Sequence, residues 1–402
     1  MRILMLAHRI PYPPHTGDKT RAFHIARYLA RRHDLTLAFL VDERADLGGL
    51  APLREVVPAV ELGLLWRPWS LVKGLTGLAV GRPLTLPYFR SRTLRLRLAG
   101  RAADAPYDLV YASSTPTAQY ARELGLPTVM DFVDVDSDKW RQYAERTAPP
   151  LSWLYRTEGR RLQAAEGDIA RWARLCVLAT ASEEGLLRSF APWARTAVVP
   201  NGIDLDYYRP IERSGSPAAV IFTGAMDYRP NIDAVRHFCD EILPRVRGAV
   251  PDTRFYIVGL NPPSEVQRLA SIPGVTVTGT VPDVRPFYAR ASVCVAPLRM
   301  GRGVQNKVLQ AMAMGLPVVA TGVAQRGLDA KPGTHLHVED DPVAFAARVT
   351  ALLTQPAARA TMGRQGRAFV EAHHAWDASC ARLEGMLCEV AGPRGDVLRA
   401  SA

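Results

Sequence analysis

The chain has 402 residues, which is more than one compact core usually serves, so its length predicts two domains. Hydrophobic residues make up 48% of it, as in ordinary globular proteins, and no apolar stretch reaches the length of a transmembrane helix. The 50 basic and 39 acidic side chains give a net charge of +11. This excess suits an anionic partner but does not choose between nucleic acid, a lipid surface and a phosphorylated substrate.

The cysteines and the first residues both indicate a cytoplasmic protein. There are five cysteines, an odd number, and none forms a C-x-x-C pair, which favours a reducing compartment. The apolar run at residues 1–7 ends at His8, too early for the hydrophobic core of a signal peptide. We therefore interpret residues 2–7 as a first buried strand.

In the first half of the chain, short apolar runs alternate with segments of helical periodicity. This alternation of expected strands and helices predicts a parallel sheet. Strands are expected at residues 2–7, 35–41, 107–113, 128–133 and 175–179, and a long helix at 151–173. In a doubly wound sheet, ligands bind beyond the carboxyl ends of the strands. The loop that follows the first strand, from His8 to Asp18, is therefore expected to lie at a binding edge.

Residues 62–97 form an unusual segment with four aromatic and seven basic side chains but no acid. Rings and cations beside apolar residues suit a surface that lies among lipid headgroups. We interpret the segment as a peripheral membrane or lipid-acceptor surface. The alternative is a set of inserted helices that pack on the first core and expose their arginines to water.

Acidic residues gather after the strand at 128–133, at positions 131, 134, 136 and 138. Closely spaced carboxylates can hold a divalent metal, but the spacing of a calcium loop is absent. Helix capping and contacts to acceptor hydroxyls are the preferred roles for Asp134 and Asp136, and no metal site is predicted.

A second alternating pattern follows the turn at residues 200–202. Strands are expected at 219–223, 254–258, 275–278, 293–296 and 317–321, with helices between them and three more from 342 to 390. Gly224 ends the first of these strands, where a side chain would obstruct a ligand. Arg229 lies in the following loop, where it can meet a phosphate or simply face the solvent.

The stretch from 298 to 321 combines a glycine-bearing loop with a helix expected at 304–314. A glycine loop that leads into a helix start presents unpaired N–H groups and the positive end of the helix dipole, which suit a phosphate. Gly303, Asn306, Lys307 and Gln310 recur at three- and four-residue steps, so they should share one polar side of this helix. An ordinary amphipathic helix with a solvated lysine is the alternative.

These residues carry a family resemblance. The run at 303–319, G-V-Q-N-K-V-L-Q-A-M-A-M-G-L-P-V-V, resembles the donor-binding segment of family 4 retaining glycosyltransferases, and most of all the sugar transferases of PEP-CTERM/exosortase gene clusters. The runs V-P-N-G-I-D at 199–204 and F-T-G-A-M-D-Y-R-P-N at 222–231 resemble the inter-domain segment and the first donor-domain turn of that family. The resemblance thus covers nearly the whole chain.

The resemblance implies an α/β protein of the GT-B fold, with two facing Rossmann-like domains and a C-terminal helix that crosses back to the first. Its expected boundaries are an acceptor domain at 1–198, a linker at 199–216, a donor domain at 217–372 and the crossing helix at 373–402. It implies donor contacts from Gly17, Gly224, Asn231, Val281, Gly303, Asn306, Lys307 and Gln310. The acceptor side is assigned to His15, Asp134 and Asp136.

Two departures from the family pattern bear on the chemistry. The family often carries two glutamates eight positions apart, the second of which contacts the donor ribose, whereas this chain has Arg302 and Gln310. The family also often carries a histidine near the end of the strand at 107–113, where this chain has Ser113 and Ser114. The groups expected to stabilise the departing diphosphate are Lys307, Arg229 and Arg302.

The sequence therefore predicts a retaining hexosyltransferase that uses a nucleotide diphosphosugar and no metal or other cofactor. Its acceptor is expected to be a lipid-linked sugar or an oligosaccharide in exopolysaccharide assembly, reached by peripheral contact of the 62–97 segment with the cytoplasmic face of the inner membrane. No nucleic acid is expected as a partner, because no reader motif is present. The alternatives are a sugar-nucleotide epimerase and a nucleotide-sugar-binding scaffold that has lost activity.

Overall fold

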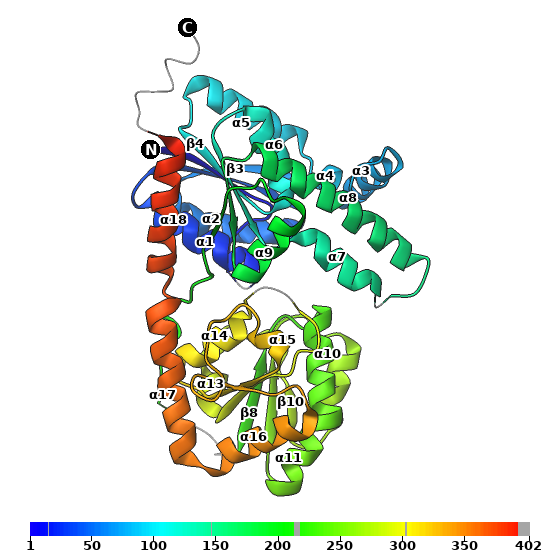
Figure 1. Ribbon diagram of the computed structural model, residues 1–402, viewed down its shortest axis with the longest axis vertical. Coiled ribbons are helices and arrows are strands. Elements are labelled where there is room, and N and C mark those ends of the chain that lie inside the picture. The colour runs from blue at the N-terminus through cyan, green and yellow to red at the C-terminus, as the bar shows by residue number, and fades with distance from the viewer. Residues whose placement is uncertain (15, 146, 213–217, 302–303, 393–402) are drawn as a thin grey trace. The chain divides into compact units, whose positions relative to one another are not determined.

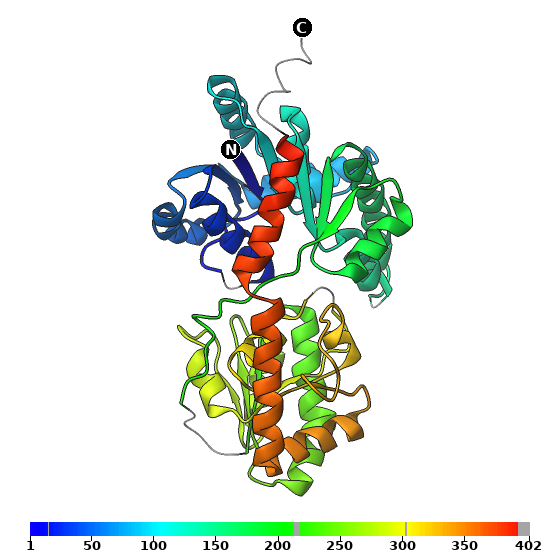
Figure 2. The ribbon, with the colours of Figure 1, turned by 60° about the vertical axis from the view of Figure 1, so that its left-hand side comes forward.

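The computed structural model describes residues 1–14, 16–145, 147–212, 218–301 and 304–392. The chain divides into two compact units, one formed by Met1–Pro200 with the segment that begins at Ser379, the other by Asn201–Ala378. Each unit is a parallel sheet with helices on both faces (Figures 1 and 2). The expected pair of Rossmann-like domains is confirmed.

The first unit contains a seven-stranded sheet with the order β3-β2-β1-β4-β5-β6-β7. Every neighbouring pair in it is parallel. The strands are β1 (Arg2–Ala7), β2 (Asp34–Val41), β3 (Ala59–Leu64), β4 (Leu109–Ser113), β5 (Thr128–Val133), β6 (Leu175–Leu178) and β7 (Thr196–Val198). The edge strands β3 and β7 escaped the sequence analysis because they are only partly buried and lack a continuous apolar run.

Helices surround this sheet, and the last one comes from the far end of the chain. They are α1 (Gly17–Ala30), α2 (Leu50–Val56), α3 (Arg67–Ala79), α4 (Thr85–Tyr88), α5 (Arg92–Asp104), α6 (Ala118–Leu124), α7 (Asp136–Glu145), α8 (Leu151–Trp172), α9 (Ala181–Phe190) and α18 (Trp376–Ala391). Helix α18 begins in the second unit and continues in the first, as predicted.

The second unit contains a six-stranded sheet with the order β10-β9-β8-β11-β12-β13. Its strands are β8 (Ala219–Thr223), β9 (Arg254–Val258), β10 (Val275–Val277), β11 (Val293–Ala296), β12 (Val318–Ala320) and β13 (His337–Val338). Its helices are α10 (Arg229–His237), α11 (Leu243–Ala249), α12 (Ser264–Gln267), α13 (Arg285–Arg290), α14 (Asn306–Ala313), α15 (Gly322–Gln325), α16 (Pro342–Thr354) and α17 (Pro356–His373).

Both sheets reverse their strand order once, between β1 and β4 in the first unit and between β8 and β11 in the second. At such a point the loops after the two central strands run in opposite directions, and a crevice forms between them. The loops concerned are 8–16 and 114–117 in the first unit, and 224–228 and 297–305 in the second.

The chain enters the second unit at residues 201–203, which contact residues 374–376 between α17 and the start of α18. The backbone N–H of Ile203 donates to the carbonyl of His374 at 2.7 Å, and a side-chain atom on Gly202 would overlap Trp376. The His374 ring lies 3.1 Å from the carbonyl oxygen of Asn201. The expectation that His374 and Trp376 serve packing is confirmed.

A buried ion pair ties α1 to the sheet of the first unit. Arg21 is 1% exposed and Asp131, on β5, is 0% exposed. The Arg21 guanidinium donates to both Asp131 carboxylate oxygens, at 2.7 and 3.2 Å, and to the Val199 carbonyl at 2.9 Å. The Tyr111 hydroxyl also donates to Asp131. Each charge is thus compensated where water does not reach it.

Replacement of Asp131 by alanine is expected to lower the free energy of unfolding by about 3–5 kcal/mol, because Arg21 would stay buried without its counter-charge. Urea denaturation of the purified protein measures this. The exposed pair of Arg122 and Asp168 provides a control, since R122A should cost less than about 1 kcal/mol. Equal losses in the two variants would contradict the assignment of Arg21 as a desolvated charge.

The carboxyl ends of β8 and β9 approach closely at two glycines. A methyl group on Gly259 would overlap the carbonyl oxygen of Gly224, and one on Gly224 would lie 2.6 Å from the Asn231 amide nitrogen. Both positions therefore lack room for any side chain, and both lie at the edge where the crevice is expected.

We expect G259A to destabilise the second unit by roughly 1–3 kcal/mol, because backbone must move to relieve the overlap. The matched control is G248A in α11, where nothing lies within 4 Å of the added methyl group. Thermal unfolding should show G248A within about 1 kcal/mol of the parent protein. A fully stable G259A protein would mean that the two strand ends can separate freely.

Candidate functional site

The carboxyl edge at β8 and β11 gathers most of the predicted donor residues that the structure describes. Residues Phe222, Thr223 and Gly224 end β8, and α14 follows the loop after β11. Lys307 and Gln310, both on α14, reach the end of β8 directly or through one hydroxyl group. These residues therefore lie at one edge of the sheet.

Lys307 is buried, with 9% of its surface exposed. Its ammonium lies 5.3 Å from the centre of the Phe222 ring and donates to the side-chain oxygen of Gln305 at 3.1 Å. No ion pair to a carboxylate is found for it among the described residues. Burial lowers the pKa of Lys307 from 10.5 to about 8. The sequence suggested a mobile lysine on a polar face of the helix. In the structure its side chain is buried and packs against Phe222.

Within the described part of the chain, the amino end of α14 has no side-chain cap, and Gln305 occupies the N-cap position. The Asn306 side-chain oxygen is buried and has no hydrogen-bond partner among the residues that the structure describes. The helix begins two residues later than expected, at Asn306. Uncapped N–H groups next to a buried cation without a carboxylate form a strong site for an anion such as a diphosphate.

Residues after β8 line the other side of the switch point. Asn231 is 4% exposed, its amide donates to the Ala225 carbonyl at 2.9 Å, and its side-chain oxygen is buried without a partner among the described residues. It lies directly against Gly224. Arg229 is the first residue of α10 and is exposed.

Gln310 takes part in a short chain of hydrogen bonds. The Tyr288 hydroxyl donates to the Gln310 side-chain oxygen at 3.3 Å and lies 2.8 Å from the Thr223 hydroxyl. Tyr288 is fully buried, and burial raises the pKa of its hydroxyl well above 10. The hydroxyl thus stays a neutral donor. An acceptor oxygen is all that this contact requires of residue 310, so a carboxylate would also satisfy it.

One ion pair across the switch point was not predicted. Arg299, in the loop after β11, donates to both carboxylate oxygens of Asp233 on α10. The pair links the loop that leads toward α14 to the helix that follows Gly224. A loop arginine and a helical aspartate 66 positions apart carry no sequence signal for such a contact.

One predicted donor residue stands apart from this edge. Val281 follows β10, the edge strand, two strands away from β8. Arg302 and Gly303 lie outside the described residues. Their predicted roles therefore stay predictions.

The carboxyl edge of the first unit holds the predicted acceptor residues, apart from His15, which lies outside the described residues. Gly17 is the first residue of α1, and Asp136 is the first residue of α7. Asp134 precedes α7 in the loop after β5. Burial raises the pKa of Asp136. Helix capping and contacts to hydroxyl groups both fit this position.

The sequence analysis missed two polar residues at this edge. His8 follows β1 directly, and its ring nitrogen Nε2 lies 3.3 Å from a carboxylate oxygen of Asp18 on α1. Burial would raise the pKa of Asp18, but hydrogen bonds from His8 and Thr16 lower it below its usual range. The position of His8, immediately after the first strand, was the available signal.

A buried glutamate lies beneath α7. Glu166, on α8, is fully buried and accepts a hydrogen bond from the backbone N–H of Ser137 at 3.1 Å. Burial, together with the nearby Asp136, raises the pKa of Glu166 to about 8. Among the described residues, no group of three His, Cys, Asp or Glu side chains is arranged to hold a metal ion.

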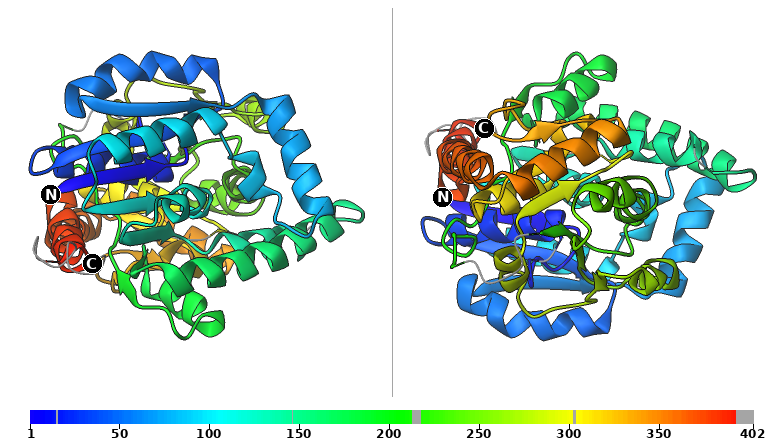
Figure 3. Two further views of the ribbon diagram at one scale, coloured as in Figure 1. Left: turned by 90° about the horizontal axis from the view of Figure 1, so that it is seen from above. Right: turned by 90° about the horizontal axis from the view of Figure 1, so that it is seen from below.

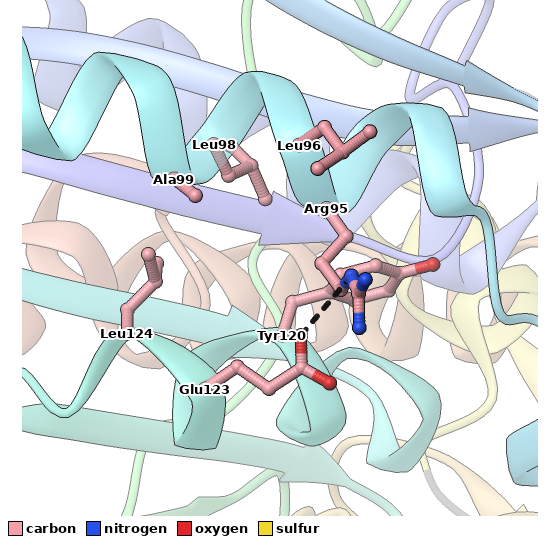
Figure 4. A pocket seen from close by; sticks show the side chains of 7 residues that line it. All are labelled: Arg95, Leu96, Leu98, Ala99, Tyr120, Glu123 and Leu124. Carbon is pink, nitrogen blue, oxygen red and sulfur yellow. Dashed lines mark ion pairs between the residues drawn. The ribbon is translucent and has the colours of Figure 1, made fainter.

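A separate pocket lies between α5 and α6 (Figure 4). It is lined by Arg95, Leu96, Leu98, Ala99, Tyr120, Glu123 and Leu124. Arg95 and Glu123 face each other across it at 3.9 Å, and the Tyr120 hydroxyl donates to the Phe89 carbonyl at 2.7 Å. The walls are apolar and these polar groups are already engaged, so this pocket does not suit a diphosphate.

Both units match protein-family models, and two mannosyltransferases are similar to about half of the chain. Residues 16–202 match the model "Glycosyl transferase 4-like domain", and residues 217–355 match "Glycosyl transferases group 1". A GDP-mannose-dependent α-(1-6)-phosphatidylinositol monomannoside mannosyltransferase of Mycolicibacterium smegmatis is 31% identical over 226 residues, which cover 50% of this chain and 58% of the relative. A monoacylated-substrate counterpart of Corynebacterium glutamicum is 29% identical over 47% of this chain and 55% of the relative. The chain thus spans little more than half the length of these relatives.

Solved structures share the fold at low sequence identity. Sucrose-phosphate synthase of Thermosynechococcus elongatus superposes with a TM-score of 0.71 at 18% identity, covering 96% of this chain and 98% of that one. HepE of Anabaena, in complex with UDP, gives a TM-score of 0.69 at 15% identity, covering 96% and 99%. Together the two sheets and these neighbours show the GT-B fold. The two family models each match one of the two units over most of its length, so the first unit is similar to a glycosyl transferase 4-like domain and the second to a glycosyl transferases group 1 domain.

Proposed function

We propose that the protein is a retaining hexosyltransferase that moves a sugar from a nucleotide diphosphosugar to a lipid-linked or oligosaccharide acceptor. The observation that carries this proposal is the buried Lys307 ammonium, without a carboxylate partner among the described residues, beside the uncapped amino end of α14. Such a cation is costly unless an anion accompanies it. The diphosphate of the donor supplies that anion.

In this reaction the bond between the anomeric carbon and the diphosphate oxygen breaks, and the acceptor hydroxyl oxygen forms the new bond on the same face. The acceptor proton passes to the departing diphosphate. Lys307 and the N–H groups of α14 stabilise the negative charge that develops there. Arg229 and Arg302 are proposed to assist, and the proposal requires no metal.

On the donor side, Gly224 and Gly303 give the diphosphate room, while Asn231 and Asn306 each offer a side-chain oxygen to the sugar or ribose. The backbone near Val281 is proposed to meet the base, and Gly17 is proposed to contact the donor, as the sequence resemblance implies. His15, Asp134 and Asp136 are assigned to the acceptor. His8 and Asp18, which lie at the same edge as Asp136, join that group as a hydrogen-bonded pair.

The relatives suggest which substrates to try first. Both curated relatives are named as GDP-mannose-dependent enzymes of phosphatidylinositol mannosides, whereas HepE was solved with UDP and with UDP-glucose. GDP-mannose and UDP-glucose are therefore the first two donors, and a glycosylated lipid is the first acceptor. Exopolysaccharide assembly within a PEP-CTERM/exosortase system, at the cytoplasmic face of the inner membrane, is the proposed setting from the sequence resemblance.

The decisive assay follows radiolabelled sugar from each donor into product, with and without acceptor. Transfer that requires acceptor supports the proposal. Formation of an epimeric sugar nucleotide in the absence of acceptor would instead establish the epimerase alternative.

K307M is expected to weaken donor binding ten- to a hundredfold, because about 1.5–3 kcal/mol of charge-assisted contact is lost. Calorimetric titration with GDP-mannose and UDP-glucose measures this. Since methionine removes a buried charge, the variant should unfold at the same temperature as the parent or higher. Unchanged donor affinity in a folded K307M protein would refute the proposed site.

Donor binding should also depend on pH through Lys307. The free protein holds the Lys307 proton below about pH 8 and releases it above, while a bound diphosphate restores the proton. The donor dissociation constant is therefore expected to be flat on the acid side of pH 8 and to rise up to about tenfold per pH unit above it.

Titrations at pH 8.5 in two buffers of different ionisation enthalpy report the proton taken up. Uptake should be about three-quarters of a proton in the parent protein, the fraction of Lys307 that is deprotonated at this pH, and should vanish in K307M. Identical uptake in the two proteins would assign the titration to another group.

Q310E is expected to raise kcat/KM about tenfold, because a carboxylate accepts a stronger hydrogen bond from the ribose hydroxyls than an amide does. The Tyr288 hydroxyl can donate to either side chain, so the fold should be kept. Steady-state kinetics test this, with Q310A as the control that removes the acceptor oxygen. Donor binding without turnover in both Q310E and the parent protein would favour the scaffold alternative.

A further inference from the structure

Helix α3 of the first unit carries its large apolar side chains on the outside. Trp69, Leu71, Val72 and Leu75 are between 45% and 57% exposed. On a helical wheel of 100° per residue they share one side with Pro68 and Ala79. Trp66 and Val80, which flank the helix, are 70% and 72% exposed. Only Thr76 interrupts this surface, which we call the α3 outer face.

The inner face of the same helix consists of small residues. Ser70, Gly74 and Gly77 are its buried positions, at steps of four and three residues. A methyl group on Gly77 would lie 2.6 Å from the Pro87 ring, and one on Gly74 would lie 3.0 Å from Leu84. The helix therefore rests on α4 through its backbone. The usual arrangement of an amphipathic helix, with large apolar residues inward, is reversed.

Neighbouring elements hold α3 in this orientation. The Lys73 ammonium donates to the Arg90 carbonyl, and the Arg161 guanidinium on α8 donates to the carbonyls of Leu78 and Arg82. Glu158, also on α8, accepts hydrogen bonds from the first residues of α4. Figures 1 and 3 show α3 at the margin of the first unit, away from its sheet. The outer face is thus a stable, outward-pointing apolar surface.

The charges around α3 favour a phosphate-bearing partner. No acidic residue occurs between positions 62 and 97. Four of the seven basic residues there, Arg67, Arg90, Arg95 and Arg97, pair with carboxylates from other segments. Arg82, just after the helix, and Arg92 are exposed and form no ion pair within the described residues. The surface is therefore apolar with unneutralised positive charge beside it.

We infer that the α3 outer face inserts into the headgroup region of an anionic lipid bilayer. Indole rings and aliphatic side chains enter the interface, while Arg82 and Arg92 meet lipid phosphates. None of the described helices combines the length and hydropathy that a membrane crossing requires, so insertion is shallow. The inference deepens the proposed function, because an enzyme with a lipid-linked acceptor has to reach a membrane surface.

Vesicle flotation tests the inference without donor or acceptor, so that its outcome is independent of catalysis. The full-length protein is mixed with vesicles of phosphatidylcholine containing 30% or no phosphatidylglycerol. We expect flotation with the anionic vesicles, and quenching of tryptophan fluorescence by lipids brominated on the acyl chain. The triple variant W69Q/V72Q/L75Q should lose at least tenfold in vesicle affinity. Because it changes only solvent-facing positions, its melting temperature should not fall.

The matched control, W193Q/V343Q, removes exposed apolar side chains elsewhere and should bind vesicles like the parent protein. Equal flotation of the triple variant would overturn the inference. So would a parent protein that ignores all vesicles but self-associates in sedimentation experiments until the triple substitution is made, since the face would then join two copies. Donor titration of the triple variant separates the outcomes, because its affinity for the sugar nucleotide should be unchanged.

Discussion

A buried lysine charge that no carboxylate neutralises, among the described residues, is the feature on which the proposed donor site depends. Lys307, the second residue of α14, packs against Phe222 at the edge between β8 and β11. Burying such a charge costs free energy, and the amino end of α14 adds further positive potential beside it. The fold therefore favours an anion at the edge of this sheet where the strand order reverses. The burial of Lys307 also explains why its pKa lies near 8, within reach of ordinary pH.

The first unit also contains a buried cation, but there a carboxylate neutralises it. Arg21 is buried even more deeply than Lys307, but it donates two hydrogen bonds to Asp131 and one to the Val199 carbonyl, and Tyr111 donates to Asp131. The charges of this pair are compensated by protein groups, so its role is to stabilise the fold of the first unit. The polar groups that stay accessible to a ligand, His8 with Asp18 and the acidic start of α7, lie at the loops after β1 and β5. Of the two buried cations, Arg21 thus stabilises the fold through a protein carboxylate, whereas Lys307 is proposed to bind a ligand.

The reversed helix α3 is a third case in which burial alone explains the choice of residues. Its glycines are needed because the helix lies close on α4, and its tryptophan and leucine residues then have no interior to enter. Four of the segment's arginines, which in the sequence looked like a continuous basic surface, form ion pairs with Glu43, Glu61 and Glu123. The positive surface is therefore smaller than composition suggested, and the apolar one is larger and better defined.

The sequence by itself determined the class of fold, the position of the central strands and the loop and helix that form the donor edge, because alternating apolar runs and glycine punctuation are local signals. It missed the marginal strands β3, β7 and β13, which are short or only partly apolar. Only the tertiary structure decided that Lys307 is buried instead of mobile, that Tyr288 and Thr223 hold Gln310, and that Arg299 joins Asp233. Each of these depends on residues brought together from distant parts of the chain, and no periodicity along the chain records which side chains will meet. The direction in which α3 turns its apolar face was decided in the same way, since a hydrophobic pattern shows that a face exists but not whether protein or solvent lies against it.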